Sequence, residues 1–184
     1  ETHRLMTATP KKLLERQVAI ASQANLKCNL VDAPAFALQA VIIHNHPEIL
    51  KSPTLILHID PSHIIIAVTH DNHLVFARNL PNFASAPDDN SSFSDIDRQA
   101  LIREIEITWR AAFEQGIPEN TQIVLAGAAA PDDQLKQTLE QSLQANVIIA
   151  DLFKSFDSDL PTESEPVNCI AQGLALRALT PETA

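Results

Sequence analysis

Histidines are the side chains in this sequence that most readily suggest chemistry, because imidazole is the commonest metal ligand in proteins. All but one of the seven histidines fall between positions 44 and 73, and these are His44, His46, His58, His63, His70 and His73. No Cys or Glu stands beside them at a spacing typical of a zinc site. We assign His58 to a turn, and His63 and His70 to opposite ends of one strand. We therefore expect solvated or structural histidines and no metal site.

Paired acids and serines are the next candidates for catalysis. Asp88 and Asp89 are adjacent, and Asp95 and Asp97 lie two positions apart. We expect these acids to solubilise a loop and to complement the N-terminus of the helix that follows. The serines between them have no His or acid at a nucleophile spacing, and the sequence contains no Gly-x-Ser-x-Gly elbow. The pattern therefore predicts no hydrolytic site.

The composition is that of a globular protein with an acidic surface. The chain has 184 residues, of which 45% are hydrophobic and 20% charged, which suffices for a proper core. A formal net charge of -10 argues against nucleic acid or an anionic membrane as a direct partner. No apolar run reaches the roughly 18 residues of a membrane span, and no charged-then-apolar leader opens the chain. We expect a cytoplasmic protein that does not insert into a membrane.

Two features bear on the compartment and on the start of the chain. Cys28 and Cys169 are the two cysteines, and we expect both to be free, buried thiols in a reducing cytoplasm. A strand-like run follows Glu1 almost at once. We therefore expect a segment to be missing before Glu1.

The first fifty residues predict a strand–helix–strand–helix unit. Residues 4–8 and 27–31 are the candidate strands. Thr9 is expected to cap a helix with Pro10 at its first position, and this helix continues to about residue 24. Pro34 opens the second helix. Such alternation is typical of an α/β fold.

Residues 54–59, 63–69 and 74–78 are β-branched runs separated by turn residues, which predicts an antiparallel meander. A mobile, polar loop is expected from residue 81 to residue 94. A helix capped by Ser94 and Asp97 then runs to Gln115, with a stop at Gly116. We expect its apolar face to bury Trp109.

Two more strand–helix pairs complete the sequence. Residues 122–126 and 147–150 are the strands. Pro131 is expected to start a helix with a core stripe at Leu135, Leu139 and Leu143. A loose acidic stretch over 155–166 precedes a closing helix over 168–179.

Five short motifs in this order resemble the PilM family of type IV pilus assembly proteins, which includes competence-protein homologues and has an actin-like (ribonuclease H-like) fold. The matching segments are 30–38 (LVDAPAFAL), 71–81 (DNHLVFARNLP), 125–130 (LAGAAA), 151–153 (DLF) and 171–177 (AQGLALR). The resemblance implies the C-terminal part of that fold, with a mixed sheet and flanking helices. Residues 1–50 would belong to the first actin-like lobe. Residues 51–184 would form the second subdomain, with a reduced nucleotide-closing subdomain.

Departures from the family pattern concern the nucleotide site. The family's Asp-Ile-Gly phosphate loop falls on the segment from His58 to Asp60, so a carboxylate replaces the glycine that lets a phosphate approach the backbone. Ser62 and Gly127 are the other degenerate positions, and the first phosphate loop has no counterpart. We therefore expect no bound cofactor, no nucleotide hydrolysis and no enzymatic activity.

The resemblance implies a scaffold of a type IV pilus or competence (DNA uptake) machine. Such a protein is cytoplasmic and peripheral at the inner membrane, where it binds the cytoplasmic tail of a membrane-anchored assembly protein. Residues expected to contact the tail are Arg4, Leu5, Met6 and Lys11, and self-association is possible. One alternative is an actin-like ATPase or sugar-kinase relative that still turns over nucleotide. The other is an actin-like cell-division protein.

Overall fold

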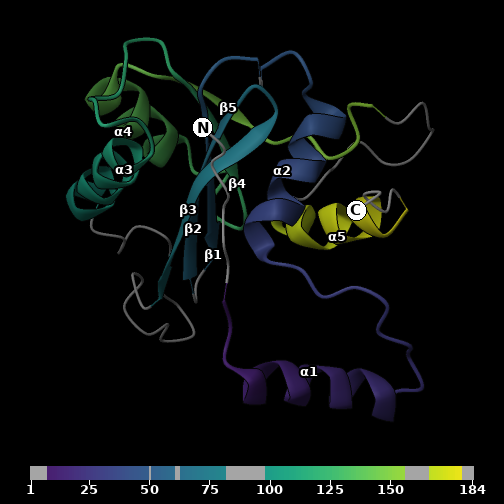
Figure 1. Ribbon diagram of the computed structural model, residues 1–184. Helices are drawn as coiled ribbons and strands as arrows, with labels where there is room; N and C mark the ends of the chain where they lie inside the picture. The colour runs from purple at the N-terminus through teal and green to yellow at the C-terminus, as the bar shows by residue number, and fades with distance from the viewer. Residues whose placement is uncertain (1–7, 50, 61–62, 82–97, 156–165, 180–184) are drawn as a thin grey trace.

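The computed structural model describes residues 8–49, 51–60, 63–81, 98–155 and 166–179. These residues form a mixed sheet in the order β3-β2-β1-β4-β5, with helices on both faces (Figure 1). The strands are β1 (Thr54–Asp60), β2 (His63–His70), β3 (His73–Pro81), β4 (Gln122–Ala126) and β5 (Asn146–Ile149). The prediction of an α/β fold with a mixed sheet and flanking helices is confirmed.

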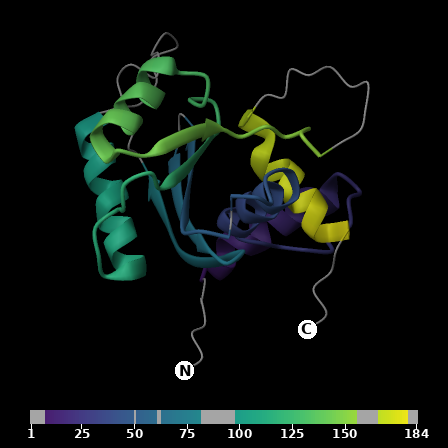
Figure 2. The ribbon, with the colours of Figure 1, turned by 90° about the horizontal axis from the view of Figure 1, so that it is seen from above.

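The helices lie in two layers that sandwich the sheet (Figure 2). Helices α3 (Arg98–Phe113) and α4 (Asp133–Leu143) cover one face. Helices α2 (Pro34–Asn45) and α5 (Cys169–Leu179) cover the other, and a short 3-10 turn, η2 (Pro166–Asn168), leads into α5. Helix α1 (Lys11–Gln23) stands apart from both layers (Figure 1). No helix in the described part of the chain is long and apolar enough to cross a bilayer.

Strands β1, β2 and β3 form the predicted antiparallel meander. The turn between β2 and β3 has φ values of 50° at Asp71 and 63° at Asn72. Asp and Asn tolerate this left-handed conformation, and two such residues in succession are typical of a tight two-residue hairpin. The turn chemistry visible in the sequence therefore determines this part of the sheet.

Strands β1, β4 and β5 are parallel neighbours. Helix α3 connects the meander to β4, and α4 connects β4 to β5. The carboxyl ends of β1 and β4 consequently lie side by side, which is where open α/β sheets bind their ligands. This edge of the sheet is the first place to look for a site.

The core on the α3–α4 side is apolar. Trp109 is fully buried, with its ring centroid 4.9 Å from that of Phe113. Leu135, Leu139 and Leu143 join the same cluster. The predictions for Trp109 and for the leucine stripe of α4 are confirmed.

One predicted strand and several predicted helix ends are wrong. Residues 27–31 form no strand and are exposed, because no strand edge lies beside them to pair with their backbone. Pro10 is the N-cap of α1, not its first helical residue, and Thr9 does not cap it. Glu114, at φ 56°, takes the left-handed turn after α3 that was predicted at Gly116. Helix α4 begins at Asp133, because the Asp132 side chain caps it by accepting from the backbone.

Some predictions fall on residues outside those described. They are most of the strand over 4–8, most of the polar loop over 81–94, the Ser94 and Asp97 cap, and most of the acidic stretch over 155–166. Of the residues that the structure does describe, Ala8 is not in a strand, and Pro81 ends β3 and does not open the loop. The division at residue 50 stays a prediction as well. Both cysteines are free, as expected, but Cys28 is exposed, as are all of residues 22–31 around it.

Candidate functional site

The edge where β1 and β4 end brings together three of the predicted site residues. His58 and Asp60 lie at the carboxyl end of β1, and Gly127 follows β4 with φ 84°. A Cβ at Gly127 would lie 2.4 Å from the backbone oxygen of Ile59, so glycine is required for this close approach of the two segments. Ser62, the fourth predicted residue, lies outside the described residues.

The backbone N–H groups of residues 127–130 all donate hydrogen bonds within the chain. Their acceptors, in chain order, are the Pro166 carbonyl, Oδ1 of Asp60, the Ile59 carbonyl and the Gly127 carbonyl, at 3.0, 3.1, 3.2 and 3.1 Å. A phosphate-binding loop works by directing free N–H groups at an anion. In this conformation the four donors after β4 are already used, and one of them binds a carboxylate.

His58 is fully buried beneath the α2–α5 layer. Its Nδ1 lies 3.7 Å from Oδ2 of Asp60. Burial lowers the pKa of His58, the Asp60 charge opposes that shift, and His63 adds to it. The ring is therefore neutral at pH 7. His58 lies on β1 and not in the turn to which we assigned it, whereas His63 and His70 do occupy the two ends of β2.

Cys169 begins α5 close to the same edge. The pKa of its thiol is raised to about 12, mainly by burial, with the charge of Asp60 adding to the rise and the backbone of Gly127 lowering it. A thiol with such a pKa is protonated at neutral pH and is a poor nucleophile. Cys169 is therefore a packing residue of this edge.

Two of the motifs behind the resemblance contact each other and hold α2 against α5. A Cβ at Gly173 would lie 1.9 Å from the carbonyl oxygen of Ala37, so the two helices meet backbone to backbone. Arg177 donates to Asp32, and its guanidinium lies 5.4 Å from the ring centroid of Phe36. These motif residues position the elements around the site and do not themselves form it.

The DLF motif is structural too. Leu152 is buried in the core on the α2–α5 side. His46, at the C-cap of α2, accepts a hydrogen bond at Nε2 from the Asp151 backbone N–H at 3.2 Å. Its imidazole is 5% exposed, and burial lowers its pKa. This motif therefore joins the chain after β5 to the end of α2.

A hollow of about 710 Å³ opens between α2, α5 and the β2–β3 turn. Its lining is mixed, with Phe36, Ile43 and Leu176 beside Gln39 and other polar residues. The sequence analysis did not identify this surface. No sequence signal marks it, because its walls come from three separate segments that only the packing of α5 on α2 brings together.

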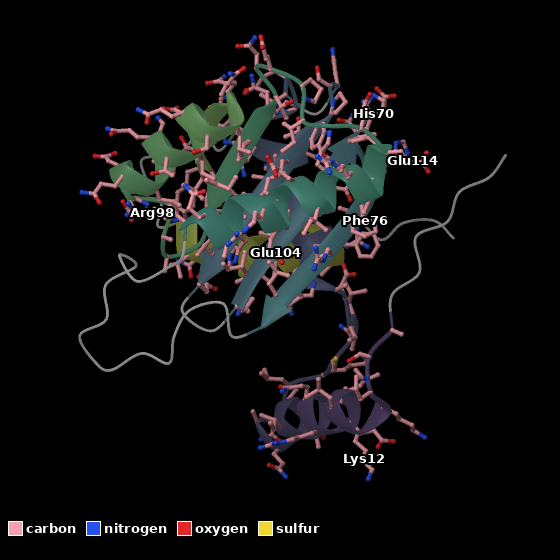
Figure 3. The ribbon with its side chains drawn as sticks, turned by 90° about the vertical axis from the view of Figure 1, so that its left-hand side faces the viewer. Lys12, His70, Phe76, Arg98, Glu104 and Glu114 are labelled. Atoms are coloured by element: carbon pink, nitrogen blue, oxygen red, sulfur yellow. The ribbon has the colours of Figure 1, made fainter. Side chains whose placement is uncertain are left out.

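Helix α1 exposes an apolar face. None of its residues is buried, and Leu13 and Ile20, seven positions apart, lie on one side of the helix, whereas the exposed Val18 lies on another side. Leu26 and Val31, in the segment that follows, are 66% and 56% exposed. Figure 3 shows Lys12 on the side of α1 away from the sheet. Exposed apolar side chains on a helix that buries none of its residues are typical of a surface that another polypeptide covers.

The residues expected to bind a partner border this helix. Lys11 is the first residue of α1 and forms a 3.5 Å ion pair with Glu15 on the solvent side. Arg4, Leu5 and Met6 lie outside the described residues. Their role stays a prediction.

Comparison with known proteins gives structural likenesses only. No family model matches the chain, and no curated protein matches it. One chain of a structure described as the PilM-PilN type IV pilus biogenesis complex superposes with a TM-score of 0.68 at 18% identity, over 91% of this chain and 58% of that one. The ethanolamine utilization protein EutJ of Carboxydothermus hydrogenoformans gives 0.60 at 13% identity, over 91% and 62%.

A third likeness is MreB5 of Spiroplasma citri bound to ADP, with a TM-score of 0.58 at 14% identity, over 95% of this chain and 67% of that one. The chain thus spans about three fifths to two thirds of the length of these structures. The likenesses establish the fold, which is the actin-like ATPase fold that the sequence motifs predicted.

Proposed function

We propose that this chain is a scaffold of a type IV pilus or competence machine, and that it binds the cytoplasmic tail of a membrane-anchored assembly protein. The observation that carries the proposal is the fold likeness to a chain of the PilM-PilN complex, together with the five motifs in their order. The protein would be cytoplasmic and would reach the inner membrane only through its partner. Self-association stays a prediction.

The apolar surface of α1 and the segment after it is the proposed docking surface. It consists of Leu13 and Ile20 on one side of α1, with Leu26 and Val31 in the segment after it, and we call it the N-terminal apolar surface. An amphipathic surface of this kind accepts apolar anchor residues of a short peptide, and anchors of that kind carry most of the binding free energy. The predicted contact residues from Arg4 to Lys11 adjoin it in sequence.

Nucleotide turnover is the competing function, and the geometry at the end of β4 argues against it. Asp60 places a negative charge where the family's loop would approach a phosphate, and the N–H groups of residues 127–130 are already hydrogen-bonded. Like charges at about 4 Å repel by several kcal/mol near a protein surface. We therefore propose that the chain does not act as an ATPase.

Peptide titration tests the scaffold function. Labelled tails of single-span membrane proteins encoded beside this chain would be titrated against wild type and against Leu13→Asp and Ile20→Asp. Each substitution places a charge on the N-terminal apolar surface and should weaken binding at least about tenfold, which is about 1.4 kcal/mol. Ser22→Asp, at an exposed position on the opposite side of α1 from Leu13 and Ile20, is the matched control and should bind like wild type. Leu5→Asp extends the test to the residues before the described helix.

Two outcomes would change the proposal. If the α1 variants bind normally while Leu179→Asp, at the rim of the α2–α5 hollow, abolishes binding, the tail docks in that hollow. If no tail of any neighbouring membrane protein binds, the scaffold function fails.

Calorimetry with Mg-ATP and Mg-ADP tests the competing function. We expect no binding in the micromolar range and no hydrolysis above background. A micromolar dissociation constant, which is about -8 kcal/mol, would favour the nucleotide-binding alternative.

A further inference from the structure

Three potential metal ligands share one face of the sheet at the β1–β2 hairpin. His58 and Asp60 are two residues apart on β1, so their side chains leave the same face. The antiparallel register pairs Asp60 with His63, which places His63 next to Asp60 on that face. One ligand atom from each of the three residues lies within 4.8 Å of the others. Small side-chain adjustments would bring all three to a common ion.

The imidazole of His58 provides an independent sign of a ligand. Its side chain has no exposed surface, and neither ring nitrogen has a hydrogen-bond partner among the described residues. Buried polar atoms almost always have a partner, so a buried imidazole without one requires an explanation. Its Nδ1 faces Oδ2 of Asp60 at 3.7 Å, toward the centre of the cluster. An ion bound there would satisfy this nitrogen.

The carboxylate of Asp60 is already oriented for such a role. Its Oδ1 accepts a hydrogen bond from the Ala128 N–H at 3.1 Å, which leaves Oδ2 directed toward His58. The loop that supplies this N–H is held to β1, because Ala129 also donates to the Ile59 carbonyl at 3.2 Å. Metal-binding carboxylates are commonly held by an outer hydrogen bond of this kind.

We propose that His58, Asp60 and His63 bind a divalent transition-metal ion, with Zn²⁺ as the expected occupant. Two imidazoles and one carboxylate match the ligands that zinc takes, whereas Mg²⁺ and Ca²⁺ take oxygen ligands. Three protein ligands leave a fourth position open for water or for a donor group of another molecule. The site is independent of the proposed tail binding, which uses α1 on a separate part of the chain.

Zinc titration of the untagged, chelator-treated chain tests the site. Calorimetry should find one Zn²⁺ per chain, and Co²⁺ as a substitute should give the visible absorption of a low-coordinate site. Asp60→Asn keeps the size of the side chain and an acceptor for Ala128, and His63→Gln removes an imidazole from a half-buried position. Each variant should weaken Zn²⁺ binding by at least about 10- to 100-fold. Circular dichroism would establish that both variants are folded.

His70→Gln and His73→Gln are the matched controls, because the half-buried His70 lies at the opposite end of β2 and the exposed His73 at the start of β3. They should leave the affinity unchanged. Absence of Zn²⁺ binding by wild type would overturn the proposal. So would equal binding by Asp60→Asn and wild type, loss of the site in His70→Gln, or effective competition by Mg²⁺. A failure of tail binding would not affect any of these results.

Discussion

The two faces of the sheet are built from different chemistry. The side covered by α3 and α4 is filled mainly with aliphatic side chains around Trp109. Its buried polar groups include Thr108, whose hydroxyl donates to the Glu104 carbonyl, and Nε1 of Trp109, which has no hydrogen-bond partner among the described residues. The side covered by α2 and α5 contains buried Gln39, Asn45, His46 and His58. Apolar burial is non-directional, whereas each buried polar group needs a particular partner. The α3–α4 side therefore contributes mainly to stability. The α2–α5 side also carries buried polar groups, which can each bind one particular partner.

Trp109→Ala gives the sharpest test of the α3–α4 side. The side chain is fully buried against Phe113, so its loss should lower the free energy of unfolding by about 3–5 kcal/mol. Urea denaturation followed by circular dichroism measures this loss. Ile107→Ala, on the same helix and 53% exposed, is the control and should change stability by less than about 0.5 kcal/mol. A loss below about 1 kcal/mol for Trp109→Ala would contradict the assignment of this side as the main apolar core.

Gly173→Ala tests whether the α2–α5 side depends on close backbone contact. The added Cβ would meet the Ala37 carbonyl oxygen at 1.9 Å, so the helices must separate, at a cost of about 1–3 kcal/mol. Gly116→Ala is the matched control, because nothing lies within 4 Å of a Cβ at that position. Thermal unfolding of the two variants measures the difference. Equal melting temperatures would mean that α5 is held to α2 loosely.

The pH dependence of stability tests the polar character of the α2–α5 side. Burial lowers the pKa of His46 below its ordinary value of 6.5, and the Lys154 charge lowers it further. The charges of Glu48 and Asp151 raise this pKa and so oppose part of the shift. A histidine with a depressed folded pKa stabilises the protein fully above its unfolded pKa and loses that contribution as the pH falls through the folded pKa. The stability of wild type should therefore decrease from about pH 8 to about pH 5.

His46→Gln is the comparison for this effect, because glutamine does not titrate and can still accept from the Asp151 N–H. Its stability should fall less than that of wild type over the same pH range. Unfolding in urea at each pH measures both. Identical pH profiles would show that His46 contributes nothing to the acid sensitivity.

Local sequence patterns predicted the elements well where the pattern and the packing agree. The β-branched runs and the Asp71-Asn72 turn predicted the meander, because a hairpin depends on neighbouring residues alone. The periodic apolar residues of α3 and α4 predicted their buried faces. The predicted strand over 27–31 failed for a different reason. A strand exists only beside another strand, and no local pattern shows whether an edge is available.

The candidate site was harder to predict than the elements. The motifs identified the end of β1 and Gly127, and the structure does bring them together. The same motifs did not show that Asp32 and Arg177, or Ala37 and Gly173, serve the packing of α2 on α5. A visible signal for the ligand cluster was overlooked. Alternation along β1 and the pairing of Asp60 with His63 suffice to place His58, Asp60 and His63 together.

The sequence by itself determined the class of the fold, because strand and helix periods and turn residues are local properties. It also supplied the carboxylate of Asp60 in place of a glycine. Only the tertiary structure decided what that carboxylate does, since its partner Ala128 is 68 positions away. Three of the four N–H groups after β4 likewise bind acceptors from distant parts of the chain, which are Ile59, Asp60 and Pro166. Hydrogen bonds between such segments depend on how the strands and α5 pack, and no local pattern encodes that packing.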